Sequence, residues 1–294
     1  MKKYILLPLL FVCCVAFAQP TYSFKSDWKK GQRFYFESVA DQDISMDGGV
    51  NNLQTIATGF TLYVKEVKPS GNKVCHVTYD KLQITSSVMQ SMGIQDAVDK
   101  AMAGLYGLGY IVEVTPEGKC MAVTGATDML RDYGIRMFPG YTPEDKFKRD
   151  EFIAKMTAQY NDSTLKAEFE DISGSFMPDA PVKLNDTWTK VTNTKLVINK
   201  TTLHTYKLEA IDGNIATVSV VTSSKTGGTT NFAGIDLAPD LTVEGNGIYK
   251  IDLTTGLAQI GDLSLTAKGT MENMGKVASV NIQSKIISSQ KEIK

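Results

Sequence analysis

The sequence predicts a mainly β protein of the α+β class: two related curved antiparallel sheets or half-barrels, with two to three helices inserted between them. Three observations predict it. Apolar and polar residues alternate over long stretches, turn-forming residues recur in the same order in both halves, and helical spacing of apolar residues is confined to the middle of the chain. The chain has 294 residues, 43% of them hydrophobic and 21% charged, which is a globular composition.

The first 18 residues have the pattern of a signal peptide. Lys2 and Lys3 give a positive start, residues 5–17 form an apolar run, and Ala16 and Ala18 supply the small residues that a signal peptidase requires. We expect cleavage after Ala18 and a periplasmic or secreted protein. The apolar run is too short to be a permanent transmembrane helix, and no other stretch approaches about 20 apolar residues, so we expect no transmembrane span.

Residues 19–125 are predicted to form the first β half. A turn at Gly31 opens a strand, and residues 63–79 read as strand, Gly-Asn turn and strand, which is a β-hairpin pattern. A helix near residues 92–105 is predicted because Ile94, Val98 and Met102 recur at helical spacing.

Residues 126–175 are predicted to form a helical connector. Thr142 can cap a helix, Pro143 suits its first turn, and the acidic residues that follow favour the positive end of the helix dipole. A shorter helix is expected from about Thr127 to Gly134.

Residues 176–294 are predicted to form the second β half. It opens at a turn around Asn185 and contains a hairpin over residues 207–220. Alternation over residues 263–267 and 278–286, with Ser284 as the one polar exception, indicates strands with one buried and one solvated face, which is typical of antiparallel sheets.

The two halves repeat the same three turns in the same order. Gly31 corresponds to Asn185 and Gly71 to Gly213, while residues 107–118 align without gaps on residues 245–256. Turn residues are few, so such matches also arise by chance between β proteins. Three ordered matches nevertheless favour an internal duplication.

Charge and motifs exclude several classes of function. Lys and Arg number 31 against 32 Asp and Glu, so neither a nucleic-acid groove nor a polybasic membrane surface is expected. Two histidines, His76 and His204, with no nucleophile elbow and no metalloprotease motif, argue against triad and zinc enzymes. We therefore predict a non-enzymatic protein with no cofactor and no metal site.

Four cysteines are present, of which Cys13 and Cys14 lie in the predicted signal peptide. Lipidation there would require a small residue before the cysteine, and Val12 precedes Cys13. Cys75 and Cys120 would remain in an oxidising compartment. Two alternatives stand for them: a disulfide, or two buried thiols that pack as small hydrophobic side chains.

The chain resembles an uncharacterised family of exported Gram-negative envelope proteins. The segments that carry the resemblance are residues 182–188, with a turn before a Trp-led strand, and residues 245–256, which begin Gly245-x-Gly247. This resemblance implies location and fold but no activity. At the level of architecture alone, the chain is also similar to the lipoprotein-carrier fold, an open half-barrel with a helical lid over an apolar cavity.

The leading functional prediction is that the protein binds an apolar ligand, lipid or lipoprotein-like, in a groove between curved sheet and helices. A structural or protein-interaction module of the cell envelope is the alternative, and a hydrolase with acidic catalytic residues is the third. The partner would be an apolar small molecule or an envelope protein. The residues expected to line the site are Met92, Val98, Met102, Leu105, Phe34, Phe36 and Trp188.

Overall fold

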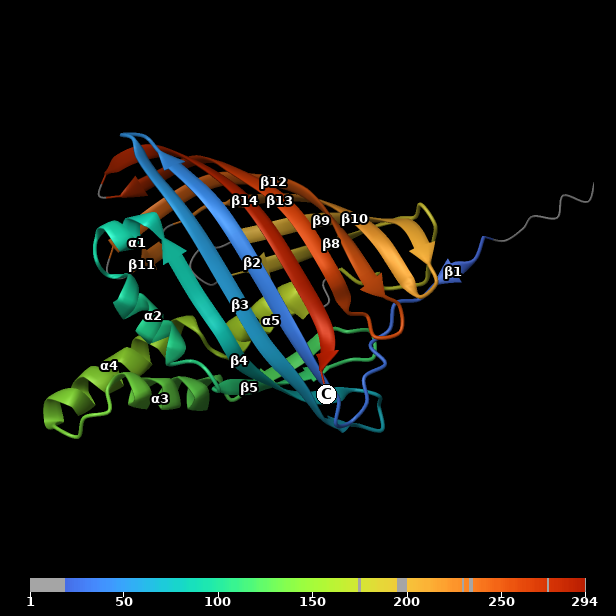
Figure 1. The fold of residues 1–294 in the computed structure, drawn as a ribbon, viewed down its shortest axis with the longest axis horizontal. Coiled ribbons are helices and arrows are strands. Elements are labelled where there is room, and N and C mark those ends of the chain that lie inside the picture. Colours follow the sequence, from blue (N-terminus) through green and yellow to red (C-terminus); the bar gives the residue numbers. More distant parts are fainter. Residues whose placement is uncertain are drawn as a thin grey trace, which may run out of the picture.

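The computed structural model describes residues 19–173, 176–194, 200–228, 230–232, 235–273 and 275–293, so the predicted signal peptide lies outside the described residues. These segments form a mainly β protein with helices between its two halves, which confirms the predicted fold class (Figure 1). The strands are β1 (Thr21–Tyr22), β2 (Arg33–Met46), β3 (Val50–Val67), β4 (Lys73–Ser86), β5 (Gly109–Val114), β6 (Cys120–Thr124), β7 (Val182–Lys183), β8 (Thr187–Thr194), β9 (Lys200–Asp212), β10 (Ile215–Thr226), β11 (Thr230–Phe232), β12 (Ile235–Asp252), β13 (Ala258–Asn273) and β14 (Lys276–Ile293). The helices are α1 (Ser87–Ser91), α2 (Gln95–Ala103), α3 (Ala126–Met137), α4 (Pro143–Gln159) and α5 (Asp162–Ser173).

One antiparallel sheet dominates the structure. Its strands lie in the order β6-β5-β4-β3-β2-β14-β13-β12-β10-β9-β8, β11 pairs with β12, and β1 pairs with β7 in a separate small sheet. The sheet curls, so that β8–β10 lie behind β2 and β3 in Figure 1, with α5 seen between them. The prediction of two sheets is corrected in one respect. Because β14 pairs with β2, the two halves join edge to edge in one sheet.

The two halves repeat one strand order. Five strands follow one another as neighbours in each half, β2-β3-β4-β5-β6 in the first and β8-β9-β10-β12-β13 in the second. β13, which ends the second meander, and β2, which begins the first, run in the same direction, so they cannot form an antiparallel pair with each other. β14 lies between them and pairs antiparallel with both, which is why a strand without a counterpart in the first half completes the sheet.

The equivalent turns also repeat their hydrogen bonds. Gly31 N donates to Val64 O at 2.9 Å, and Asn185 N donates to Leu208 O at 2.8 Å. Both turn residues have positive φ, +91° at Gly31 and +69° at Asn185. Asparagine tolerates this left-handed conformation better than other non-glycine residues. The repeated geometry supports the internal duplication inferred from the sequence.

The three predicted helices are present as α2, α3 and α4. Thr142 forms a capping box with Asp145, and Pro143 begins α4, as its sequence pattern predicted. Two helices were not predicted. They are α1, which Ser86 caps, and α5, which lies within the predicted helical connector of residues 126–175 but was not singled out there.

The buried side chains form two clusters, one in each half. In the first, strand residues such as Phe34 and Leu62 pack against Leu130 of α3 and Phe169 of α5. In the second, no helix of the described residues contributes. Phe24 from the N-terminal segment and Phe176 from the segment after α5 cover the strands instead.

Candidate functional site

The two faces of the large sheet differ in character. The inner face, defined here as the face that carries Phe34 and Phe36, packs on α3 and α5. The outer face carries mostly polar and charged residues, for example Asp41 and Thr55, whose side chains hydrogen-bond to each other at 2.7 Å. Alternation along each strand produces this difference because successive side chains point to opposite faces. A ligand that prefers an apolar surface would therefore bind on the inner face.

An apolar row crosses nine strands of the inner face. Its members are register partners on neighbouring strands: Trp188, Tyr206, Val220, Gly247, Leu263, Ile286, Ala40, Ile56 and Ile84. Its β8–β13 end packs in or against the second core cluster. At its other end, Ile286, Ala40, Ile56 and Ile84 are half-buried and belong to neither cluster of the described residues. This end is apolar surface that the described residues leave partly uncovered.

A mostly polar row runs beside the apolar row, farther from the two cores. Its register partners are Lys190, His204, Thr222, Gly245, Leu265, Ser284, Gln42, Gln54 and Ser86. His204 Nδ1 lies 3.0 Å from Thr222 Oγ1, and its Nε2 lies 3.4 Å from Thr192 Oγ1. The inner face therefore offers an apolar and a polar surface side by side, which suits an amphipathic ligand.

The sheet stays open between its two edge strands, β6 and β8, and α5 contacts both of them. Leu165 and Phe169 anchor α5, because each is 1% exposed and packs in the first core cluster. On the same helix, Lys166 Nζ forms an ion pair with Glu170 Oε1 at 2.7 Å. The helix thus spans the opening that an unclosed sheet leaves.

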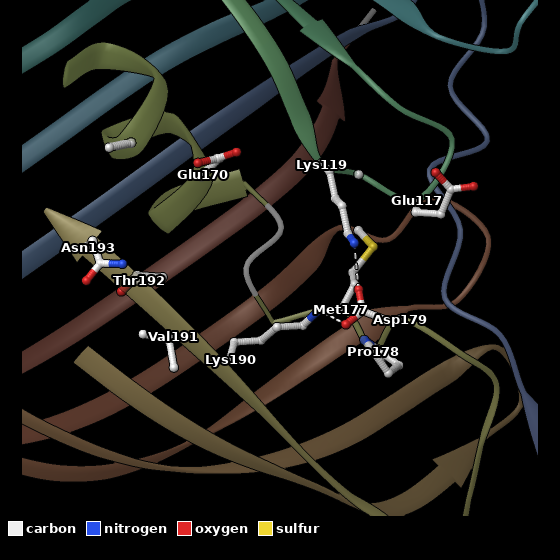
Figure 2. A pocket seen from close by; sticks show the side chains of 12 residues that line it. Glu117, Lys119, Glu170, Met177, Pro178, Asp179, Lys190, Val191, Thr192 and Asn193 are labelled. Atoms are coloured by element: carbon white, nitrogen blue, oxygen red, sulfur yellow. Dashed lines mark ion pairs between the residues drawn. The ribbon is translucent and has the colours of Figure 1, made fainter. Parts of the chain in front are cut away.

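A pocket of about 330 Å³, here called the seam pocket, lies at this opening (Figure 2). It is lined by the turn before β6, by α5, by the segment after α5 and by β8. The lining residues are Glu117, Gly118, Lys119, Ala167, Glu170, Met177, Pro178, Asp179, Lys190, Val191, Thr192 and Asn193.

Two lysines hold one carboxylate in the seam pocket. Lys119 Nζ lies 2.8 Å from Asp179 Oδ1, and Lys190 Nζ lies 2.9 Å from Asp179 Oδ2. Hydrogen bonds from Lys119 and Lys190 lower the pKa of Asp179 to about 2, so this carboxylate stays ionised at any physiological pH. The same contact with Asp179 raises the pKa of Lys119. Figure 2 shows the three side chains converging from three separate segments.

Three of the residues predicted to line a site lie in or beside the cores. Phe34 and Phe36 are 0% and 2% exposed and pack in the first cluster, where Phe36 stacks on Phe60 with ring centroids 4.8 Å apart. Trp188 is half-buried, donates from its indole Nε1 to Phe176 O at 2.8 Å, and begins the apolar row. Trp188 is thus part of the candidate site, whereas the two phenylalanines support it from the core.

The four residues predicted on a covering helix lie at the end of α1, on α2 and in the segment after α2. Met92 ends α1 and is 65% exposed. Val98 and Met102 on α2 are half-buried, and Leu105 packs against the first core cluster. No residue of α2 is buried, and the helix contacts β4. The helix that contacts both edge strands of the open sheet is α5 rather than this segment.

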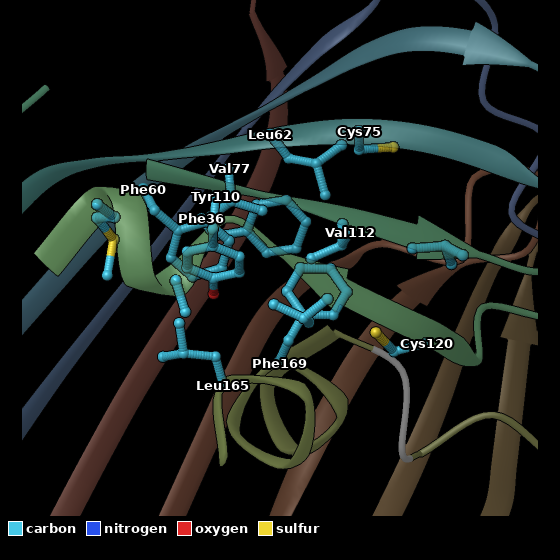
Figure 3. Packing of buried hydrophobic residues seen from close by; sticks show 14 of the residues in the cluster. Phe36, Phe60, Leu62, Cys75, Val77, Tyr110, Val112, Cys120, Leu165 and Phe169 are labelled. Atoms are coloured by element: carbon cyan, nitrogen blue, oxygen red, sulfur yellow. The ribbon is translucent and has the colours of Figure 1, made fainter. Parts of the chain in front are cut away.

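Cys75 and Cys120 are buried free thiols in the structure, which is the second of the two alternatives from the sequence (Figure 3). Cys75 lies on β4 and Cys120 on β6, with β5 between them. Two strand spacings are about 10 Å, whereas disulfides require Cα atoms within about 7 Å. Burial raises the pKa of both thiols to about 12, so neither has the thiolate character of a reactive cysteine.

Sequence reasoning missed the seam pocket. Lys119, Asp179 and Lys190 are far apart in the sequence, and single charged residues in turns and strands carry no motif. The usable signal was the predicted helical connector of residues 126–175, since a helix between two β halves has to pack on one or both of them.

Two further features concern metals and membranes. Within the described segments, no group of three or more His, Cys, Asp or Glu residues is placed to hold a metal ion. None of the helices described is both long and apolar enough to cross a membrane.

Comparison with solved structures finds distant likenesses. A lipovitellin structure, titled for its lipid–protein interactions, matches with a TM-score of 0.46 and 8% identity over 90% of this chain. This chain spans 25% of that lipovitellin chain. OpdQ of Pseudomonas aeruginosa matches with a TM-score of 0.28 and 8% identity, covering 91% of this chain and 100% of its own. Ail of Yersinia pestis matches with a TM-score of 0.20 and 5% identity, covering 90% and 100%.

Comparison by sequence gives the family. No curated protein matches the chain. Residues 70–258, more than half of the chain, match a family described as a family of unknown function. This match confirms the resemblance to an uncharacterised family that the sequence indicated. The chain belongs to this family, DUF6263.

Proposed function

We propose that the protein is an exported, non-enzymatic binding protein that holds an apolar or amphipathic ligand on the inner face of its curved sheet. The observation that carries the proposal is the half-buried end of the apolar row, formed by Ala40, Ile56, Ile84 and Ile286 outside both core clusters. Covering each half-buried isoleucine would contribute roughly 1 kcal/mol, so several together supply useful affinity. Contiguous partly uncovered apolar surface of this kind is typical of ligand-binding faces.

The carboxyl groups with displaced pKa values bear on the hydrolase alternative. A hydrolase with acidic catalytic residues needs one carboxylic acid whose pKa is raised so that it can donate a proton. Among the described residues, each carboxyl group with a displaced pKa is displaced downward, by hydrogen bonds from lysine or from neighbouring polar groups. These groups are Asp47, Glu113, Asp145, Asp179 and Glu209.

The proposed exported location rests on residues 1–18. Their positive start, apolar run and Ala16-Phe17-Ala18 motif are the elements that the secretion machinery recognises. N-terminal sequencing of the protein from its own host is expected to begin at Gln19. A protein that retains Met1 and remains in the cytoplasm would contradict the export proposal.

Adjacent residues on β14 provide a matched test of the binding proposal. Ile286 lies on the inner face in the apolar row, whereas Ile287 lies on the outer face and is 43% exposed. We expect the apolar fluorophore N-phenyl-1-naphthylamine to bind the wild-type chain and to bind Ile286→Asn about tenfold more weakly. Ile287→Asn is the control and should bind the probe as the wild type does.

The results separate the functional alternatives. Equal loss of probe binding in both variants would show that the asparagine destabilises β14 and does not remove a contact. A wild-type chain that binds no probe would overturn the proposal and leave the protein-interaction alternative. Native mass spectrometry of protein purified from its host adds an independent measurement, since a bound ligand would appear as a fixed mass above that of the chain.

A further inference from the structure

The seam pocket contains a two-lysine clasp whose three parts come from different regions of the chain. Lys119 belongs to the turn before β6 at one edge of the sheet, and Lys190 belongs to β8 at the other edge. Asp179, which both lysines contact, lies in the segment between α5 and β7. The clasp thus sits where the open sheet would otherwise give access to its inner face.

The carboxylate in the clasp is replaceable. The side chain of Asp179 is 62% exposed, and that of Lys119 is 60% exposed, so water already competes for their ion pair. Exposed pairs of this kind contribute little to stability. Lys190 differs, because its side chain is only 17% exposed, and a partly desolvated ammonium group requires an anionic partner. An external carboxylate or phosphate could take the place of Asp179 without leaving Lys190 unpaired.

The position of Lys190 connects the clasp to the apolar row. Lys190 and Trp188 are two residues apart on β8, so both side chains point to the inner face about 7 Å apart. Trp188 begins the apolar row, and Lys190 begins the polar row beside it. Met177 and Ala167 add apolar surface to the pocket itself. The next members of the row, Tyr206 and Val220, are each 2% exposed, so a molecule with its anionic head group at Lys190 would carry its chain past them to the uncovered end of the apolar row.

We propose that the seam pocket binds the anionic head group of an amphiphile, a carboxylate or a phosphate, between Lys119 and Lys190 in place of Asp179, with the end of the acyl chain on the uncovered part of the apolar row. This inference rests on the proposed function and adds the class of ligand. Asp179 then acts as an internal competitor that occupies the clasp when no ligand is bound. The pocket volume of about 330 Å³ accommodates a head group and the first methylene groups.

Probes with one chain and different head groups test this inference on the chain starting at Gln19. Palmitate and hexadecanol have the same chain length, and only palmitate carries a charge. We expect palmitate to bind about tenfold more tightly than hexadecanol, since charge-assisted hydrogen bonds to two lysines form only with the anion. Inorganic phosphate alone tests whether the clasp is a site for a free anion.

Two variants should change the affinity for palmitate in opposite directions. Lys119→Gln combined with Lys190→Gln should remove the preference for palmitate, whereas Asp179→Asn should raise palmitate affinity several-fold because the competitor is gone. Hexadecanol affinity should be unchanged in both. Lys155→Gln is the control, since Lys155 forms an exposed ion pair with Glu151 on α4, away from the seam pocket. The readout is the ratio of the two affinities within each variant, which does not depend on the fraction folded.

Each failure has a distinct meaning. Equal affinities of palmitate and hexadecanol for the wild-type chain would overturn the head-group inference and leave the proposed function intact. Binding of neither probe would overturn the proposed function itself. If Asp179→Asn weakens palmitate binding, Asp179 supports the site and does not compete for it. If inorganic phosphate displaces palmitate at concentrations similar to those of palmitate, the clasp is a site for a free anion, which would contradict the proposal that the ligand is an amphiphile.

Discussion

The two halves of the sheet share a strand order but differ in what covers them. Each half is a five-strand meander with equivalent turns. The corresponding glycines approach different neighbours: a Cβ on Gly109 would overlap Val77 O on the preceding strand β4, whereas a Cβ on Gly247 would overlap Asp262 O on the following strand β13. In the first half, α3 and α5 bury the inner face. In the second half, irregular segments around Phe24 and Phe176 do so.

The difference shows that turns and alternation fix the sheet, while the covering elements decide which part of it stays accessible. In the first half, helices cover the part of the inner face that carries Phe34 and Phe36. In the second half, irregular segments cover the part that carries Tyr206 and Val220. The strands of β2, β3, β13 and β14 extend beyond both coverings. The candidate site lies in this region, between the two cores. The following predictions test how independent the halves are.

The largest expected effect is the difference in cysteine reactivity between the native and the unfolded chain. Both cysteines lie in the first half, so they report on that half alone. Cys75 and Cys120 are both buried there, and burial raises the pKa of each thiol to about 12. We expect no reaction of the native chain from Gln19 onward with Ellman's reagent, and two reactive thiols in urea without any reductant. One continuous sheet should expose them together with the tryptophan fluorescence change.

The control for the thiol measurement is Ser264→Cys, at an exposed position on β13, which should react at once in the native protein. If neither thiol reacts in urea, Cys75 and Cys120 form a disulfide, which would contradict the prediction. Thiol exposure at a lower urea concentration than the fluorescence change would show that the halves unfold separately.

The second prediction compares Phe34 with its counterpart Trp188. Phe34 is 0% exposed and its ring lies 5.1 Å from that of Trp28, so Phe34→Ala should lower the free energy of unfolding by about 4 kcal/mol. Trp188 is half-buried, so Trp188→Ala should cost about 2 kcal/mol. Urea titrations followed by circular dichroism measure both. Equal losses would mean that the irregular segments cover the second half as completely as the helices cover the first.

The smallest effect concerns the repeated turn. Gly31 has φ +91° with no atom within 4 Å of an added Cβ, so Gly31→Ala introduces only backbone strain, about 1 kcal/mol. Gly31→Asn copies the second half, where Asn185 adopts φ +69°, and should cost less. Thermal unfolding of the two variants gives the comparison. An asparagine that destabilises as much as alanine would show that the two turns are not equivalent.

Much of the fold was predictable because its signals are local. Alternation identified the strands around residues 263–267 and 278–286, Gly-Asn turns identified the hairpins, and the pattern from Thr142 identified α4. Helix α5 was not singled out within the predicted helical connector, although Asn161 Oδ1 accepts hydrogen bonds from Ser163 N and Thr164 N in the first turn of the helix. The union of the halves into one sheet was missed because strand pairing between β2 and β14 is a long-range contact.

The candidate site was only partly predictable. Trp188 was expected on it, because a Trp-led strand in an alternating pattern places the ring on the apolar face. The apolar row requires the register of nine strands, and a shift of one residue in any strand would turn its member to the outer face. Lys119, Asp179 and Lys190 come together only because α5 and the segment after it cross the open side of the sheet.

The strand pattern, three of the helices, the repeated turns and the inner-apolar, outer-polar character were determined by the sequence alone, because each depends on residues a few positions apart. Tertiary structure decided the rest: the role of β14 between like-directed strands, the distance that keeps Cys75 and Cys120 apart, and the meeting of two lysines on Asp179. These depend on register, curvature and the path of the connecting segments, which are set by packing over the whole chain and not by any local pattern.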